Sequence, residues 1–485
     1  MTYHLAIDIG ASSGRLILAD YKDCKWVLSE IYRFKNGFHY ADGHDRWDVD
    51  ELFHQILLGL EKAKQKGITK CTLGIDTWAV DYVLLKDGQA LMPPIAYRDR
   101  RTEGAMEEVF QKLSAEMIYQ KTGIQLLNFN TLFQYTKEDK RLLNETEVSL
   151  LIPDYLMYRL TGKVVAEKTN ASTTQLLNIH TGDYDNSLLK IAGIKRKQLP
   201  DLIDAGSYIG KILPDLSKQY NLPEVSVYTV ASHDTASAIV GIPSEAENLA
   251  YISSGTWSLI GIENDVPIVT KGSLEANYTN EWGAYDTFRF LKNITGMWIV
   301  QEIARNLDYK YSYSEMAEKA SEVAPFEQFV NLDEERFSNP TNMIEEIQSY
   351  CREHGEKIPE TVGELTMCAY SNLALLYARE WKRLERLTGK VLDVLHIVGG
   401  GSNVSLLNQL TANLIQKTVI AGPSEATAIG NLLVQLIATG EFADIREARR
   451  FLKNLVNLQK FEPQAISSQD LIQTFEEKMK KRSQR

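Results

Sequence analysis

The segment ASHDTASA, residues 231–238, contains the residues whose types and order best suit catalysis. It follows an apolar run at 225–230 that predicts a strand, and it precedes an apolar helix. A carboxylate at such a junction can take a proton from a substrate hydroxyl, so Asp234 is a candidate general base, with His233 and Thr235 placed to touch the substrate. The motif alone supports equally well a second interpretation, in which Asp234 only caps the helix.

A glycine-rich turn near the start of the chain, DIGASSGR, predicts a phosphate site. Backbone N–H groups in such a turn can point at one phosphate, and glycine lets the chain approach it closely. Asp8, just before the turn, could hold Mg²⁺ through water. The alternative is an ordinary hairpin turn. The predicted phosphate contacts are Ala11, Ser12, Ser13, Gly14 and Arg15.

Two later segments extend this prediction to a whole nucleotide. SSGTWS, residues 253–258, suits a second phosphate clip in which Thr256 faces the nucleotide, although alone it indicates a hairpin turn. In HIVGGGSN the glycines Gly399, Gly400 and Gly401 separate a buried strand from a helix, which leaves room for a nucleoside over the helix N-terminus. Val404 stands where a dinucleotide-binding fingerprint needs its third glycine, and no GxxxxGK[ST] loop occurs in the chain.

GASSG also matches the nucleophile-elbow pattern of serine hydrolases, which would make Ser12 a nucleophile. That pattern requires a helix directly after the serine. The residues that follow, RLILADY, have the pattern of a strand instead. The sequence therefore disfavours a hydrolase.

The elements that must position these motifs occur twice. The first copy has strands at 4–9 and 15–19, a helix that begins with a capping box of Asp48 and Glu51 and ends at Gly67, and a strand at 72–75. YISSGTWSLIGIEN can be aligned with AIDIGASSGRLILAD so that Gly255 falls on Gly10. A long helix at 365–387 and a strand at 394–398 follow. We predict an internally duplicated α/β fold with domains at 1–245 and 246–485.

Composition restricts the kind of partner. The chain has 485 residues and a net charge of −11, which disfavours a nucleic-acid partner. No apolar run is long enough to predict a membrane span, and Asp8 interrupts the position where a signal peptide needs apolar residues. The four cysteines are scattered without metal-like spacing, which favours the reducing cytoplasm and no zinc site.

Taken together and in this order, the motifs resemble those of the FGGY carbohydrate kinases, a branch of the actin–hexokinase–chaperone superfamily, from about residue 3 to about residue 437. The sequences of these motifs are most similar to those of the branch that acts on L-rhamnulose. The strings that carry this likeness are GASSGR, GIDTWAVDYVLL, AYRDRRT, TGIQLLNFNTL, TNASTTQL, ASHDTASA, FLKNITG and HIVGGGSN. The resemblance implies two actin-like (ribonuclease H-like) domains with a central cleft, the first on the sugar and phosphate side and the second on the nucleotide side.

The resemblance also implies an activity: transfer of phosphate from ATP, with Mg²⁺, to the 1-hydroxyl of L-rhamnulose. Asp234 matches the catalytic base of the family and His233 and Thr235 its sugar contacts. Asn293 matches another sugar contact, and Gln301 a nucleotide contact.

One substrate-binding position departs from the pattern. Ala79 stands where this branch usually has glycine, and its methyl group would tighten the sugar pocket. A sister kinase for L-fuculose, D-xylulose or L-ribulose is the alternative, and a nucleotide-driven switch without a sugar is a third interpretation.

Overall fold

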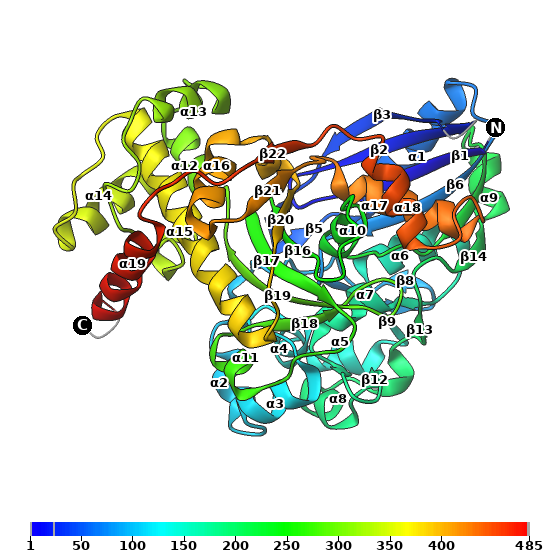
Figure 1. Ribbon diagram of the computed structural model, residues 1–485. Coiled ribbons are helices and arrows are strands. Elements are labelled where there is room, and N and C mark those ends of the chain that lie inside the picture. Colours follow the sequence, from blue (N-terminus) through cyan, green and yellow to red (C-terminus); the bar gives the residue numbers. More distant parts are fainter. Residues whose placement is uncertain (1, 23–24, 483–485) are drawn as a thin grey trace. The chain divides into compact units, whose positions relative to one another are not determined.

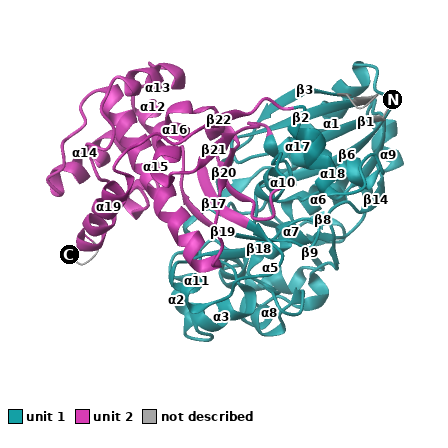
Figure 2. Ribbon diagram, in the orientation of Figure 1, with its two compact units in different colours: residues 1–245, 263–290, 426–455 teal, residues 246–262, 291–425, 456–485 magenta. Residues whose placement is uncertain are grey.

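The computed structural model describes residues 2–22 and 25–482, and the chain divides into two compact units (Figures 1 and 2). Unit 1 consists of residues 1–245, 263–290 and 426–455, and unit 2 of residues 246–262, 291–425 and 456–485. The chain first passes between the units at 245/246, where the sequence predicts the domain boundary. Two later segments, 263–290 and 426–455, return to unit 1.

Unit 1 is built on a six-stranded sheet. The strand order is β14 (Tyr208–Lys211), β15 (Glu224–Tyr228), β6 (Lys70–Thr77), β1 (Thr2–Ile9), β2 (Ser13–Lys22) and β3 (Lys25–Lys35). β15, β6 and β1 run parallel, whereas β2, β3 and β14 are antiparallel to their neighbours. Because parallel strands end at one edge of a sheet, the residues that follow β1, β6 and β15 lie close together.

Helix α1 (Val49–Gln65) follows the predicted pattern closely. The side chain of Asp48 accepts from the N–H of Glu51, but the Glu51 carboxylate accepts from Gln55 instead of closing the capping box. The apolar face of α1 joins the core of unit 1 beside Leu5 and Ile75.

Unit 2 repeats this arrangement. The second sheet has seven strands, in the order β18 (Thr279–Trp282), β19 (Phe288–Thr295), β17 (Trp257–Asn264), β16 (Ala250–Ser254), β20 (Val394–Val398), β21 (Thr418–Ala421) and β22 (Gln459–Phe461). Of these, β18 and residues 288–290 of β19 belong to unit 1. β16 pairs antiparallel with β17 and parallel with β20, as β1 does with β2 and β6. The predicted duplication is therefore confirmed, including the helix before the third strand, α15 (Val362–Thr388), which ends at Gly389.

The remaining helices and strands lie outside these two sheets, apart from β18, and their strands form small sheets of two or three. In unit 1 they are β4 (Phe38–Ala41), β5 (His44–Trp47), β7 (Tyr82–Lys86), β8 (Gln89–Ala90), α2 (Ala105–Phe110), α3 (Ala115–Thr122), α4 (Thr131–Thr136), α5 (Lys140–Glu145), β9 (Val148–Leu151), α6 (Ile152–Thr161), β10 (Ala166–Glu167), α7 (Lys168–Ala171), β11 (Leu177–Asn178), β12 (Asp183–Tyr184), α8 (Asn186–Ala192), β13 (Leu202–Ile203), α9 (Pro214–Gln219), α10 (Asp234–Val240), α11 (Lys271–Glu275), β18 (Thr279–Trp282), α17 (Ala426–Ala438) and α18 (Ile445–Lys453). In unit 2 they are α12 (Trp298–Asn306), α13 (Tyr313–Ser321), α14 (Met343–Glu353), α16 (Ser405–Ile415) and α19 (Ser468–Arg482).

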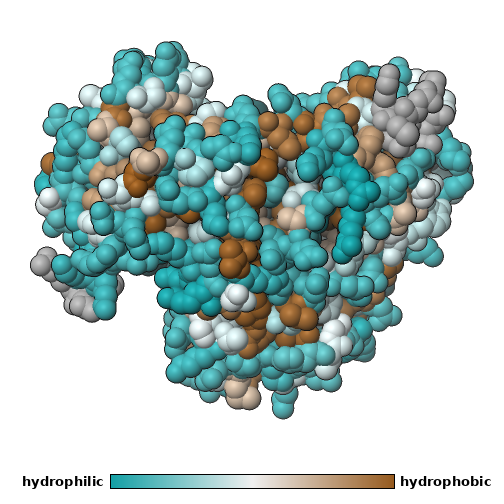
Figure 3. Space-filling model, in the orientation of Figure 1, coloured by the Kyte–Doolittle hydropathy of each residue, from teal (hydrophilic) through white to brown (hydrophobic). Residues whose placement is uncertain are grey.

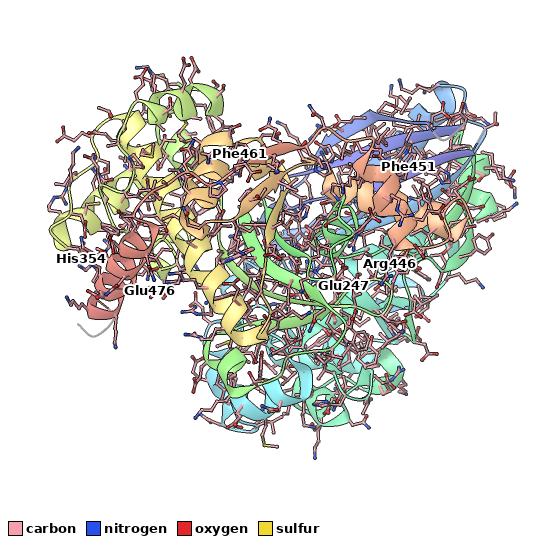
Figure 4. All side chains as sticks on the ribbon, viewed as in Figure 1. Glu247, His354, Arg446, Phe451, Phe461 and Glu476 are labelled. Carbon is pink, nitrogen blue, oxygen red and sulfur yellow. The ribbon has the colours of Figure 1, made fainter. Side chains whose placement is uncertain are left out.

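The returning segment 426–455 completes the core of unit 1. Phe451 of α18, labelled in Figure 4, has its ring centroid 6.1 Å from that of Trp26 on β3. α17 packs against α10 so closely that side chains would clash. A Cβ at Gly430 would lie 1.8 Å from the carbonyl oxygen of Ser237, and one at Gly241 would lie 2.2 Å from that of Ala426. Only glycine permits this approach of the two backbones.

No helix in the described part of the chain is long and apolar enough to cross a membrane. The face shown in Figure 3 is covered mostly by hydrophilic side chains.

The α10–α17 contact gives a stability prediction. Alanine in a helix interior normally stabilises by about 1 kcal/mol relative to glycine, but Gly430→Ala inserts a methyl group where no space exists. We expect it to destabilise by on the order of 1–3 kcal/mol, measured as a lower Tm. Gly37→Ala is the control, because a Cβ there meets nothing within 4 Å. An unchanged or higher Tm for Gly430→Ala would contradict the packing.

Candidate active site

Three carboxylates gather where the parallel strands of unit 1 end. β1 and β6 pair in a register that sets Asp8 opposite Asp76. The N–H of Thr77 donates to the carbonyl oxygen of Ser232 over 2.9 Å, which joins β6 to the segment that carries Asp234. The strand order therefore assembles the predicted base and the predicted metal-associated carboxylate on one edge.

These carboxylates influence one another. Burial raises the pKa of Asp76 well above its usual range, the charges of Asp8 and Asp234 raise it further, and a 2.6 Å hydrogen bond from Asn431 opposes them. Burial also raises the pKa of Asp234 and the Asp8 charge adds to this, while His233 and the hydrogen bonds from Thr235 lower it. Arg15 offsets part of the negative charge, because its Nη2 and Nε both donate to Oδ2 of Asp8, at 2.7 and 3.0 Å.

The position of Asp234 favours a chemical role over capping. His233 occupies the N-cap of α10, and Asp234 is the first helical residue. Oδ1 of Asp234 accepts from the N–H of Thr235 at 2.5 Å and from its hydroxyl at 3.1 Å. Oδ2 accepts no hydrogen bond from the described residues, and 34% of the side chain is exposed. One carboxylate oxygen is thus fixed and the other is free.

The glycine turn is a hairpin between β1 and β2, so the strand predicted after Ser12 is confirmed and a hydrolase elbow is not formed. The N–H of Gly10 donates to the carbonyl oxygen of Ser13 over 2.9 Å, while Ala11 and Ser12 are exposed. Gly14 is buried, and a Cβ there would lie 2.1 Å from the Phe34 ring, so packing requires this glycine.

Ala79, which the sequence predicts to contact the sugar, lies in a strained turn. Val80 has φ of +66°, which is rare for a β-branched residue, and the N–H of Asp81 donates to the carbonyl oxygen of Ala79 over 2.9 Å. Such strain persists only where the surrounding structure imposes it, and it concentrates at ligand sites.

Asp81 imposes the shape of this turn. Its buried carboxylate accepts from the indole N–H groups of Trp47 and Trp78, at 2.7 and 2.9 Å, and from Gln134 at 3.0 Å and the N–H of Tyr97 at 3.1 Å. Burial raises its pKa to about 6, although these four bonds favour the ionised form. Sequence reasoning missed this role; the available signal was one acidic residue inside the apolar run AVDYVLL.

The nucleotide residues predicted in the second half lie in unit 2. The hydroxyl of Thr256 donates to the side-chain oxygen of Gln301 over 3.4 Å. The turn that carries Thr256 is fixed to α12, because Met297 and Trp298 donate to the carbonyl oxygens of Gly255 and Thr256, at 3.0 and 3.2 Å.

The triple glycine approaches the same hairpin. Gly399 has φ of +80°, and a Cβ there would lie 2.8 Å from the carbonyl oxygen of Ser254; one at Gly401 would lie 2.0 Å from its hydroxyl. Gly400 is exposed with open space around its Cβ position, which suits a flat ligand. Asn293, the predicted sugar contact, is half-buried on β19.

The predicted residues thus form two groups. The group in unit 1 consists of residues 8–15, Ala79, His233, Asp234 and Thr235. The group in unit 2 consists of Thr256, Asn293, Gln301 and the three glycines. Within the described ranges, no cluster of three or more His, Cys, Asp or Glu side chains is arranged to hold a metal directly.

Comparison with known proteins decides the family. The N-terminal domain of the FGGY family of carbohydrate kinases matches residues 3–241, and its C-terminal domain matches residues 250–439. The chain belongs to the FGGY family of carbohydrate kinases. The two matched domains correspond to the two copies of the repeat.

Among its relatives, a rhamnulokinase of Ligilactobacillus salivarius is 53% identical over 96% of both chains, and one of Bacillus subtilis is 51% identical over 98% of both. A solved xylulose kinase from Lactobacillus acidophilus shares the fold with a TM-score of 0.82 at 16% identity, covering 98% of this chain and 97% of that one. The Plasmodium falciparum glycerol kinase with ADP has a TM-score of 0.78 at 15% identity, covering 100% and 98%.

Asp81→Asn tests the buried carboxylate. Its folded-state pKa of about 6 lies above the usual 3.8, so between these values the folded protein binds more protons than the unfolded chain. The stability that Asp81 contributes therefore falls as pH rises through this window, by up to about 3 kcal/mol, whereas asparagine does not titrate. We expect the Tm difference between wild type and Asp81→Asn to be larger at pH 4.5 than at pH 7.5. A difference that is constant or widens with pH would contradict the assignment.

Proposed function

We propose that this chain transfers the γ-phosphoryl group of ATP to the 1-hydroxyl of L-rhamnulose. The central observation is Asp234, whose Oδ2 is unpartnered among the described residues while its Oδ1 is held by Thr235. The choice of sugar rests on full-length relatives that are 41–53% identical and bear the name rhamnulokinase. L-Fuculose, D-xylulose and L-ribulose are the alternatives, and the presence of Ala79 makes them worth testing.

In the proposed reaction, Oδ2 of Asp234 accepts the proton of the sugar hydroxyl as the hydroxyl oxygen forms a bond to the γ-phosphorus. The bond between the γ-phosphorus and the oxygen of the β-phosphate breaks, and ADP leaves. The raised pKa of Asp234 makes it a better proton acceptor than an ordinary carboxylate. His233, Thr235, Ala79 and Asn293 would orient the sugar.

The residues around Asp8 fit a magnesium ion. The charge of Asp8 raises the pKa of both Asp76 and Asp234, and the buried Oδ1 of Asp76 has no hydrogen-bond partner among the described residues. A cation would relieve this concentration of negative charge. We propose that Asp8 holds Mg²⁺ through water, where the ion would supply charge neutralisation for the phosphate oxygens.

The remaining predicted contacts would bind ATP. The exposed turn of Ala11, Ser12 and Ser13 offers N–H and hydroxyl groups to the phosphates, with Gly14 supporting it and Arg15 beside it. Thr256 and Gln301 would contact the nucleotide from unit 2, and the open surface at Gly400, between Gly399 and Gly401, would receive the nucleoside. We place the reaction in the cytoplasm, where ATP is available and scattered thiols stay reduced.

A coupled assay of ADP release tests the proposal. Mg-ATP is offered with L-rhamnulose, L-fuculose, D-xylulose, L-ribulose or glycerol. We expect the highest kcat/KM with L-rhamnulose. A preference for another ketose would overturn the substrate, and the variant Ala79→Gly would show whether the methyl group causes it. ADP release that no sugar stimulates would support a nucleotide switch.

Asp234→Asn tests the base. We expect kcat to fall by about 10²–10⁴-fold, with no loss of Tm, because a carboxylate whose pKa is raised by folding does not stabilise the ionised protein. Asp201→Asn is the control, since the Asp201 side chain is 99% exposed. Turnover of Asp234→Asn close to that of wild type would remove Asp234 from the mechanism.

A further inference from the structure

A buried arginine in unit 1 has no role in the reaction described so far. Arg289 on β19 is 0% exposed and lies against His233, with Nη2 3.2 Å from Nδ1 of the imidazole. Nε and Nη2 also donate to the carbonyl oxygen of Trp282, each over 3.2 Å. These contacts fix the guanidinium plane beside the imidazole ring.

The charge of Arg289 is balanced by Glu281, whose Oε2 lies 2.9 Å from Nη2. Burial alone would raise the pKa of Glu281, but the charge of Arg289 holds it below its usual range, so the pair is ionic. Stability does not explain this pair. Buried ion pairs contribute little net stability, and Nη1 of Arg289 is buried without a hydrogen-bond partner in the described structure.

The chemistry of the donors determines the protonation of His233. Nδ1 of His233 lies 3.2 Å from Nη2 of Arg289 in a hydrogen bond, and 3.3 Å from Oε2 of Glu281 in an ion-pair contact without a hydrogen bond. A guanidinium can only donate, so in the hydrogen bond with Arg289 Nδ1 of His233 accepts. In the neutral ring the proton then lies on Nε2, which is 3.4 Å from Oδ1 of Asp234. The oxygen that faces this N–H is the same one that Thr235 holds.

We infer that Arg289 is a positioning residue for phosphoryl transfer. It fixes the His233 tautomer in which Nε2 carries the proton, and this N–H faces Oδ1 of Asp234. The carboxylate is thereby oriented with Oδ2 toward the sugar hydroxyl. Glu281 neutralises Arg289 so that the buried cation is tolerated. This inference rests on the proposed kinase function only for its kinetic consequence; the tautomer follows from the contacts alone.

The tautomer is measured through the ¹⁵N chemical shifts of the imidazole nitrogens in the full-length protein, with the His233 signals assigned by their loss in His233→Gln. We expect the Nε2–H form in wild type. In Arg289→Gln the carboxylate of Glu281, whose Oε2 lies 3.3 Å from Nδ1, becomes the neighbour of Nδ1 and we expect the proton to move there. An Nδ1–H form in wild type would overturn the inference, whatever the enzyme phosphorylates.

The kinetic test uses a charge-balanced variant in case Arg289→Gln does not fold. We expect Arg289→Gln/Glu281→Gln to keep a Tm near that of wild type but to lower kcat about 10-fold or more, a part of what a general base supplies, with KM for ATP unchanged. Recovery of the wild-type kcat in the double variant would show that the pair only maintains the fold and would overturn the inference.

The matched control is another ion pair of unit 1, Arg449 with Glu263 at 2.7 Å. Arg449 is buried and donates to the carbonyl oxygens of Ile239 and Val240 in α10, but it does not touch His233. We expect Arg449→Gln/Glu263→Gln to leave both the His233 tautomer and kcat unchanged. An equal loss of kcat in this control would show that any buried pair has the same effect and would contradict a specific role for Arg289.

Discussion

Repulsion among three clustered carboxylates is the constraint around which the site of unit 1 is organised. The parallel strands β1 and β6 place Asp8 and Asp76 opposite each other, and the segment after β15 adds Asp234 to the same edge. Each charge makes the others more costly to bury. Arg15, Asn431 and His233 offset part of this cost from different elements. The remaining negative charge suits a cation that accompanies ATP, and the raised pKa suits a base.

The close contact of α10 and α17 belongs to the same arrangement. α17 supplies Asn431 to Asp76, and its Gln435 donates to the carbonyl oxygen of Leu5 on β1 over 2.9 Å. Gly430 brings the helix near enough to α10 for these bonds to form. α17 therefore completes the site of unit 1, although Asn431 and Gln435 lie 355 and 430 residues along the chain from their partners on β6 and β1.

Much of this could be predicted from sequence, since strand periodicity and glycine turns are local signals. The duplication, the hairpin at DIGASSGR, the strand at 394–398 and the long helix before it all follow from such patterns. The return of segments 263–290 and 426–455 to unit 1 depends on contacts between distant residues, so no local pattern indicates it. For the same reason the roles of Asp81 and Arg289 were missed. Asp81 lies 16, 34 and 53 residues from Tyr97, Trp47 and Gln134, and Arg289 lies 56 residues from His233, so only folding brings them together.

The central claim is that Asp234, with its pKa raised by burial and by Asp8, must be ionised to accept the proton of the sugar. The most direct test is the pH dependence of kcat/KM for the sugar in wild type, measured over the range in which the protein stays folded. We predict that kcat/KM falls as pH decreases, with an apparent pKa clearly above the 3.8 of an ordinary aspartate. A kcat/KM that stays constant from pH 7 down to pH values near 4 would contradict this account.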